Sequence, residues 1–206
     1  MKKLIRLRGL FLVFIFAIAI VTLPAVNVSA LKYGIGKYGT CTYNTCGITL
    51  SSINNLSVDV APISNGSCSI NKDVISVTTG SSTGYTVTLT TNSGSNSLSN
   101  GSSNITAGSG TFSLPQTLGV NQWGYRVDGS GSFGSGPTTV KTNSNFPITD
   151  IFSGVPANTG TPSTVVNSSL PANPTVNTNV WYGVCADTNL SSGQYTGTVV
   201  YTAVIN

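Results

Sequence analysis

Two cysteines stand five positions apart in the stretch YGTCTYNTCG, which covers residues 38–47. Cysteines at short spacing can bind zinc, carry out redox chemistry or form a disulfide. A zinc site would need a second such pair or histidine, but Cys41 and Cys46 have no neighbouring pair and the sequence contains no histidine. A redox motif has two residues between its cysteines, whereas four separate these. We therefore expect Cys41 and Cys46 to be structural, and we predict no metal site.

The four cysteines form an even set, which in an exported chain is typical of disulfides. Three pairings of four cysteines are possible, and we favour Cys41–Cys46 as a local loop with Cys68–Cys185 as a long-range link. In the chain-entropy model the local ring would stabilise the fold by about 2 kcal/mol and the long loop by at most about 5 kcal/mol.

Catalytic groups are scarce in this chain. Histidine and glutamate are absent, so general acid–base catalysis would depend on five scattered aspartates, on lysine or on tyrosine. A serine nucleophile stays open as a remote alternative, that of a hydrolase, although no G-x-S-x-G motif occurs. We predict no catalytic residues, no cofactor and no enzymatic activity.

Aromatic side chains are the remaining candidates for ligand contact. Trp181 and Tyr182 are adjacent, so in a strand they point to opposite faces and one of them could face outward. An exposed ring could stack on the apolar face of a sugar, but aromatic rings also fill the cores of β-sandwiches. We name Trp181 and Tyr182 as possible ligand-contact residues of a glycan-binding module.

The N-terminus is typical of an export signal. Lys2, Lys3, Arg6 and Arg8 precede an apolar run over residues 10–21, and small residues at Val28-Ser29-Ala30 offer a cleavage site. The run is shorter than the roughly 20 residues that a spanning helix prefers. We predict a signal peptide over residues 1–30 and no membrane span in the mature chain, with an uncleaved anchor as the alternative.

The net charge of +4 comes from this segment. Four of the nine lysines and arginines lie in it, which leaves five against five aspartates and a mature net charge of zero. Binding to nucleic acid or to an acidic membrane surface would require a basic patch, so we predict neither.

The rest of the chain is rich in serine, threonine, asparagine and glycine, and its apolar residues alternate with polar ones. Such alternation recurs near residues 56–60, 75–77, 85–89, 123–127, 180–187 and 195–205. Short strands separated by turn residues indicate an all-β fold, an antiparallel β-sandwich of the Ig-like or Greek-key type. We expect an N-terminal extension with the first disulfide over residues 31–47 and the sandwich domain over 48–206. Residues 92–109 and 156–178 are polar or proline-rich and are predicted to be long connections or short edge strands blunted by proline.

The last two predicted strands are separated by the turn-like sequence TNLSSG and therefore suggest a hairpin. Because the final one alternates over eleven residues, 195–205, we expect it to lie in the centre of a sheet beside residues 180–187.

Several segments resemble a known group of proteins. CTYNTCGITL (residues 41–50), WGYRVDG (123–129) and VWYGVCAD (180–187) are similar to secreted surface proteins of Saccharibacteria-type candidate-phyla bacteria, small-genome cells that live attached to other cells. The closing residues 192–202 are also similar to the last strands of Gram-positive surface sandwiches, including WxL-type domains, although Trp-x-Leu is absent. The resemblance implies a surface-exposed sandwich and supplies no active site.

These observations predict a secreted or cell-surface, non-catalytic β-sandwich with a structural or adhesive role. Its partners would be further copies of itself, other surface components or host-cell glycans. The mode of surface attachment, the ligand and the oligomeric state are left open by the sequence.

Overall fold

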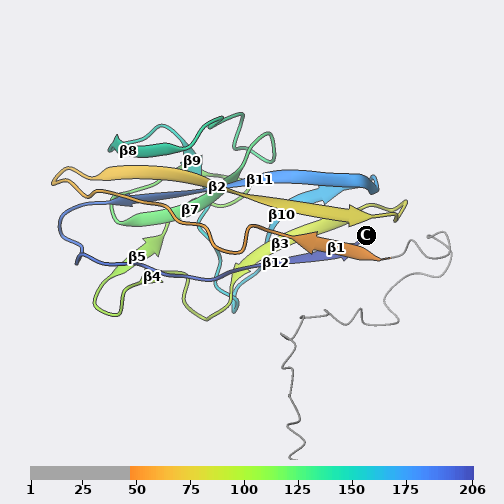
Figure 1. Ribbon diagram of the computed structural model, residues 1–206, viewed down its shortest axis with the longest axis horizontal. Helices are drawn as coiled ribbons and strands as arrows, with labels where there is room; N and C mark the ends of the chain where they lie inside the picture. The colour runs from red at the N-terminus through yellow and green to blue at the C-terminus, as the bar shows by residue number, and fades with distance from the viewer. Residues whose placement is uncertain (1–46) are drawn as a thin grey trace, which may run out of the picture. The chain divides into compact units, whose positions relative to one another are not determined.

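The computed structural model describes residues 47–206, and this part of the chain consists of strands and loops (Figure 1). The all-β sandwich expected from the sequence is confirmed. The predicted signal segment and the pair Cys41 and Cys46 lie outside the described residues. The strands are β1 Ile48–Ser51, β2 Ser67–Thr79, β3 Tyr85–Thr91, β4 Leu98–Ser99, β5 Asn104–Ala107, β6 Gln116–Thr117, β7 Gln122–Val127, β8 Lys141–Asn145, β9 Ile151–Phe152, β10 Ser163–Ser168, β11 Ala172–Ala186 and β12 Val199–Ile205.

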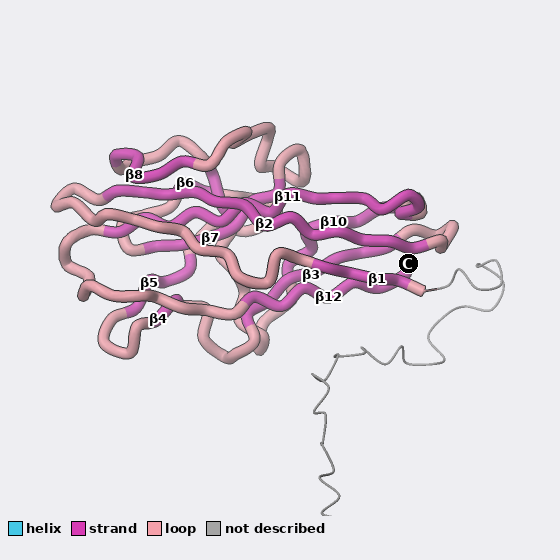
Figure 2. Tube along the Cα trace, viewed as in Figure 1, coloured by secondary structure: helices cyan, strands magenta, loops and turns pink. Residues whose placement is uncertain are grey.

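Two sheets face each other across the main core (Figure 2). The large sheet has the order β1-β2-β11-β7-β5-β4, and β8 also pairs with β2. The small sheet has the order β10-β3-β12, and β6 with β9 forms a separate two-stranded ribbon. The strand pairs are antiparallel except for β5 with β7.

The alternation read from the sequence places side chains correctly. In β3 the residues Tyr85, Val87 and Leu89 are buried, while the threonines between them lie on the outer face of the small sheet. The inward residues of β2 and β7 follow the same period of two and meet those of β3 in one apolar core. Burial of β-branched and aromatic side chains between the sheets is the main favourable contribution to this fold.

The prediction for the last strand is wrong. β12 does not form a hairpin with β11, because it pairs with β3 in the small sheet and lies at the edge of that sheet. The alternation of β12 reflects one face against the core and one face toward solvent, not a central position. β11 fills the central position beside β2 and β7 instead.

One other segment differs from expectation, and for two loose regions the alternative of short edge strands holds for β4 and β10. The residues Leu56, Val58 and Val60 do pack on the core, but they lie in extended chain outside any strand. The polar region 92–109 contains the short strands β4 and β5, and region 156–178 contains β10 and the first part of β11. These strands have largely exposed or polar residues, so no clear alternation marks them in the sequence.

Candidate functional site

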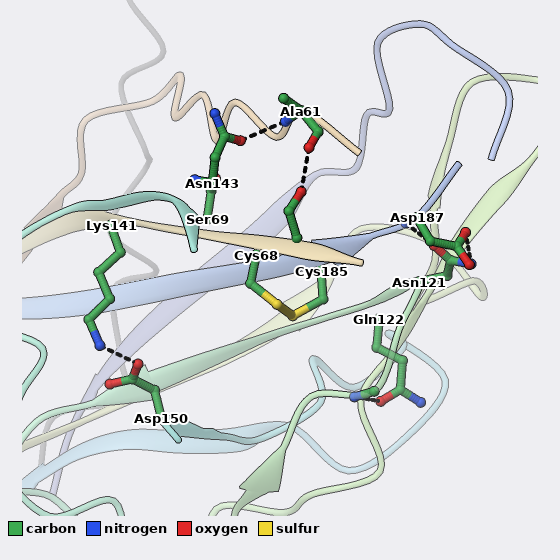
Figure 3. Close-up of a disulfide and its surroundings, with 12 residues drawn as sticks. Ala61, Cys68, Ser69, Asn121, Gln122, Lys141, Asn143, Asp150, Cys185 and Asp187 are labelled. Carbon is green, nitrogen blue, oxygen red and sulfur yellow. Dashed lines mark hydrogen bonds and ion pairs between the residues drawn. A yellow bond between two sulfur atoms is a disulfide. The ribbon is translucent and has the colours of Figure 1, made fainter. Parts of the chain in front are cut away.

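The disulfide between Cys68 and Cys185 joins the two central strands of the large sheet (Figure 3). The residues are directly opposite each other in the β2–β11 ladder, with Cα atoms 4.1 Å apart and 117 positions between them in sequence. Both cysteines are fully buried. The long-range pairing expected from the sequence is therefore present, and these two sulfurs are withdrawn from solvent.

A second apolar cluster surrounds the disulfide on the face of the large sheet that is turned away from the main core. Trp181 and Phe152 are its largest members, each no more than 2% exposed. Phe152 fits there because two glycines, Gly124 and Gly183, stand opposite each other on β7 and β11. A Cβ at Gly183 would lie 2.6 Å from the Phe152 ring, so a larger residue would displace the ring. The cluster covers the outer face of the strands that hold the disulfide.

Trp181 and Tyr182 point to opposite faces, as their adjacency predicts. Trp181 lies in the second cluster, where the Lys72 Nζ atom is 5.5 Å from its ring centroid. Tyr182 lies in the main core, stacked on Trp123 with ring centroids 6.4 Å apart. Trp181 is 2% exposed and Tyr182 is 7% exposed, so neither ring has a free face for a sugar in this structure.

A buried chain of hydroxyl groups crosses the core between the two sheets. The Tyr182 and Tyr201 hydroxyl oxygens are 2.7 Å apart, and the Asp73 side chain is buried on the face of β2 that meets the same core. Asp73 Oδ1 accepts a hydrogen bond from the Ile53 backbone at 2.9 Å. Burial is the main cause that raises the pKa of both tyrosines above the ordinary value of 10.0.

Sequence reasoning missed this network, although one signal was present. Asp73 occupies the same face of β2 as Ile75 and Val77, so a period of two places its carboxylate in the core. A buried carboxylate needs polar groups around it, so Asp73 indicates that this core contains polar groups such as tyrosine hydroxyls.

The turn after β11 is held by a second polar cluster, at Asp187 (Figure 3). The Asn121 side chain donates to Asp187 Oδ1 at 3.0 Å and accepts from the Asp187 backbone at 3.0 Å. The Asn189 backbone and side chain donate to the same carboxylate. These hydrogen bonds, that of Asn121 first, lower the pKa of Asp187. The carboxylate therefore acts as an acceptor that fixes two loops.

The ion pairs also lie on the side of the large sheet. Arg126 is buried, and its Nε atom is 2.9 Å from Asp128, while its other nitrogens donate to the Ile151 and Phe133 carbonyls. Lys141 Nζ is 2.5 Å from Asp150. Within residues 47–206, no three His, Cys, Asp or Glu side chains gather in a way that could hold a metal ion.

Two shallow hollows open on the described surface. The larger, about 310 Å³, lies beside the start of β12 and is lined by hydroxyl, amide and backbone groups: Thr91, Asn92, Ser93, Ser95, Ser97, Ser99, Thr196, Gly197 and Thr198. The smaller, about 90 Å³, includes Asp59, Ser69 and Lys141 in its lining. The larger hollow offers hydrogen bonds without charge, which suits a neutral polar ligand such as a sugar hydroxyl.

Comparison with known proteins adds no family, since no family model, no curated protein and no solved structure matches this chain. No helix within residues 47–206 is long and apolar enough to cross a membrane.

Proposed function

We propose that this protein is exported and serves as a non-catalytic structural or adhesive domain at a bacterial cell surface. The Cys68–Cys185 disulfide is the observation that carries the proposal, because structural disulfides form and persist mainly in oxidising compartments such as the cell exterior. The basic and apolar N-terminal sequence and the resemblance to Saccharibacteria-type surface proteins support the same placement.

Localisation and thiol chemistry test this proposal together. Cells that produce the full chain are separated into medium, salt wash, detergent wash and cytosol, and each fraction is treated with a thiol-specific alkylating reagent before reduction. We expect the protein in the medium or in a wash, with no alkylated cysteine. A protein that stays in the cytosol with four alkylated cysteines would contradict the proposal. The double variant Cys68→Ser/Cys185→Ser serves as the control for the alkylation signal.

A glycan-binding module is the second candidate, and the hydroxyl-lined hollow beside β12 favours it. Asn92 and Thr196 face this hollow, and both lie outside the main core. If the hollow binds a sugar, Asn92→Ala should reduce binding on a glycan array while the melting temperature stays nearly unchanged. Asn167→Ala, on the outer face of β10, is the matched control, because it removes an exposed amide away from the hollow. Equal binding by the Asn92→Ala variant and the unmodified chain would remove this candidate.

A further inference from the structure

β12 is a long free edge of the small sheet. Its seven residues, Val199–Ile205, pair with β3 in an unbroken register. Within residues 47–206 no strand pairs with its other side; β1 lies near it, but hydrogen-bonds to β2 (Figure 1). A free edge presents backbone N–H and C=O groups that can bind another strand.

The backbone groups that face this free side can be identified. The Asn206 backbone donates to Gly84, and Thr198 accepts from the Asn92 backbone, so the even-numbered residues of this segment bond toward β3. Antiparallel ladders alternate, and the odd-numbered residues therefore direct their N–H and C=O groups away from β3. Tyr201 and Ala203 lie in the middle of that open row.

The side chains of β12 are symmetric about Thr202. An antiparallel copy centred there would place Thr202 opposite Thr202, Val200 opposite Val204, and Tyr201 opposite Ala203. Val200, Thr202 and Val204 form the exposed row, with Val200 39% and Val204 50% exposed. Val–Val and Thr–Thr neighbours are favourable cross-strand pairs. The strand is therefore complementary to a second copy of itself.

Charge does not oppose this pairing. A two-fold axis at Thr202 brings that residue next to its own copy, so a charged residue on the axis would meet a like charge. β12, β3 and β10 contain no charged residue, and the charged residues nearest to them in sequence are Asp73, Asp150 and Asp187, of which Asp73 belongs to β2 and Asp187 directly follows β11 in the large sheet.

Three other edge strands in the described chain carry features that disfavour pairing. β10 follows Pro162 and has a register shift between Thr164 and Val166, and both features disfavour an added strand. β8 contains Lys141 and has Asn143 in the left-handed region with φ 51°. β4 has two residues, and Ser99 already bridges to Thr196. β12 lacks a proline, a charge and a bulge.

We propose that two copies of this protein associate through antiparallel pairing of their β12 strands, with the two-fold axis at Thr202. The two small sheets then form one continuous six-stranded sheet, and the isologous contact closes at a dimer instead of growing into a fibre. The inference rests on the proposed structural role, which it gives a defined assembly unit. Its test uses purified protein in solution, so a negative result would leave export and the disulfide untouched.

A charge placed on the axis tests the pairing. The full chain, purified from the exported fraction, is examined by analytical ultracentrifugation up to about 100 µM, where a small interface of this kind should produce dimers. Thr202→Lys should weaken dimerisation by at least about tenfold, because two lysines would meet at the axis. The matched control is Thr88→Lys, which adds the same charge to the outer face directly opposite Thr202 on β3, one strand away from the edge.

Mixing variants then tests the symmetry. Thr202→Lys and Thr202→Glu should each be monomeric, and an equal mixture should dimerise again, because a lysine meets a glutamate across the axis. An unmodified chain that stays monomeric, an equal effect of Thr88→Lys and Thr202→Lys, or a mixture that does not recover would each overturn the proposal.

Cysteine cross-linking keeps the test valid if a charged variant fails to fold. Under mild oxidation Val200→Cys mixed with Val204→Cys should form a covalent dimer, whereas either variant alone should cross-link several-fold less, because residues 200 and 204 oppose each other only across two copies. Equal cross-linking by the separate variants and the mixture would contradict the register.

Discussion

The two sheets of this sandwich differ in how they meet solvent. The large sheet is covered on both faces, by the main core on one side and by the Trp181 cluster on the other. The small sheet is covered on one face, and its outer face consists of threonine, valine and asparagine side chains that are partly or fully exposed. Within residues 47–206, the disulfide and the two ion pairs belong to the large-sheet side.

The large sheet therefore contributes most of the stability, and the small sheet offers the surface for contacts with other molecules. β2 and β11 are held by a long ladder, a covalent bond and apolar packing on two faces, so changes there should lower the free energy of unfolding strongly. The outer face of the small sheet has no comparable packing, and substitutions there should affect association more than folding.

The largest effect is expected from Trp181. Trp181→Ala removes the largest fully buried side chain and leaves a cavity above the disulfide, which should lower the free energy of unfolding by about 3–5 kcal/mol. Urea denaturation followed by circular dichroism measures it. The same experiment on Val200→Ala, at the exposed edge of the small sheet, should show a change below about 0.5 kcal/mol. Equal losses for the two variants would remove the contrast between the sheets.

Removal of the disulfide comes next. Cys68→Ser/Cys185→Ser should lower the free energy of unfolding by about 2–5 kcal/mol, because the bond closes a loop of more than a hundred residues in the unfolded chain. The loss should appear in thermal melts without reductant. If strong reductant leaves the melting temperature of the unmodified chain unchanged, and if this temperature equals that of the double variant, the bond is not formed.

The hydroxyl chain that connects the sheets gives a smaller effect. Tyr201→Phe deletes the hydroxyl that pairs with Tyr182 in the core, and should lower the free energy of unfolding by about 1–3 kcal/mol. Tyr195→Phe is the matched control, since that hydroxyl donates to a backbone carbonyl in an exposed region. A loss as small as that of the control would mean that the network does not fasten β12 to β11.

The dependence of stability on alkaline pH tests the protonation of Tyr182 and Tyr201 in the same network. The pKa values of Tyr182 and Tyr201 are raised in the folded protein, so the unfolded chain loses these protons first as the pH rises through about 10. The contribution of the two hydroxyls is therefore fully present below pH 10 and is lost at higher pH. The urea midpoint should fall between pH 9 and pH 11, and it should fall less in the double variant Tyr182→Phe/Tyr201→Phe. A parallel decline in both proteins would contradict this explanation.

Period-two alternation predicted the cores of β2, β3 and β7 because each has one buried face in the main core. The pairing Cys68–Cys185 was also predicted, since few arrangements are available to four cysteines. β11 and the exposed strands were harder to predict from the sequence. The first residues of β11 are polar and contain Pro174 at a register shift, so local sequence does not mark them as strand.

The position of β12 could not be predicted because alternation gives the face of a strand and not its neighbours. Tyr201 illustrates this point, since its hydroxyl reaches Tyr182 of β11 across the core, where the sequence suggested that the two strands lie side by side. The Asp187 cluster depends on Asn121, which is 66 residues away in sequence. Contacts between residues so far apart in sequence form only when the sheets assemble, so local sequence patterns do not predict them.

The most direct test of the account is the identity of the disulfide in the exported protein. Digestion without reduction by a protease that cuts before aspartate separates residues 59–72, which contain Cys68, from residues 150–186, which contain Cys185, and from the N-terminal peptide with Cys41 and Cys46. Mass spectrometry should find peptide 59–72 linked to peptide 150–186 and no free thiol on either. A link from either peptide to Cys41 or Cys46, or free thiols at Cys68 and Cys185, would contradict a large sheet that is locked by this bond.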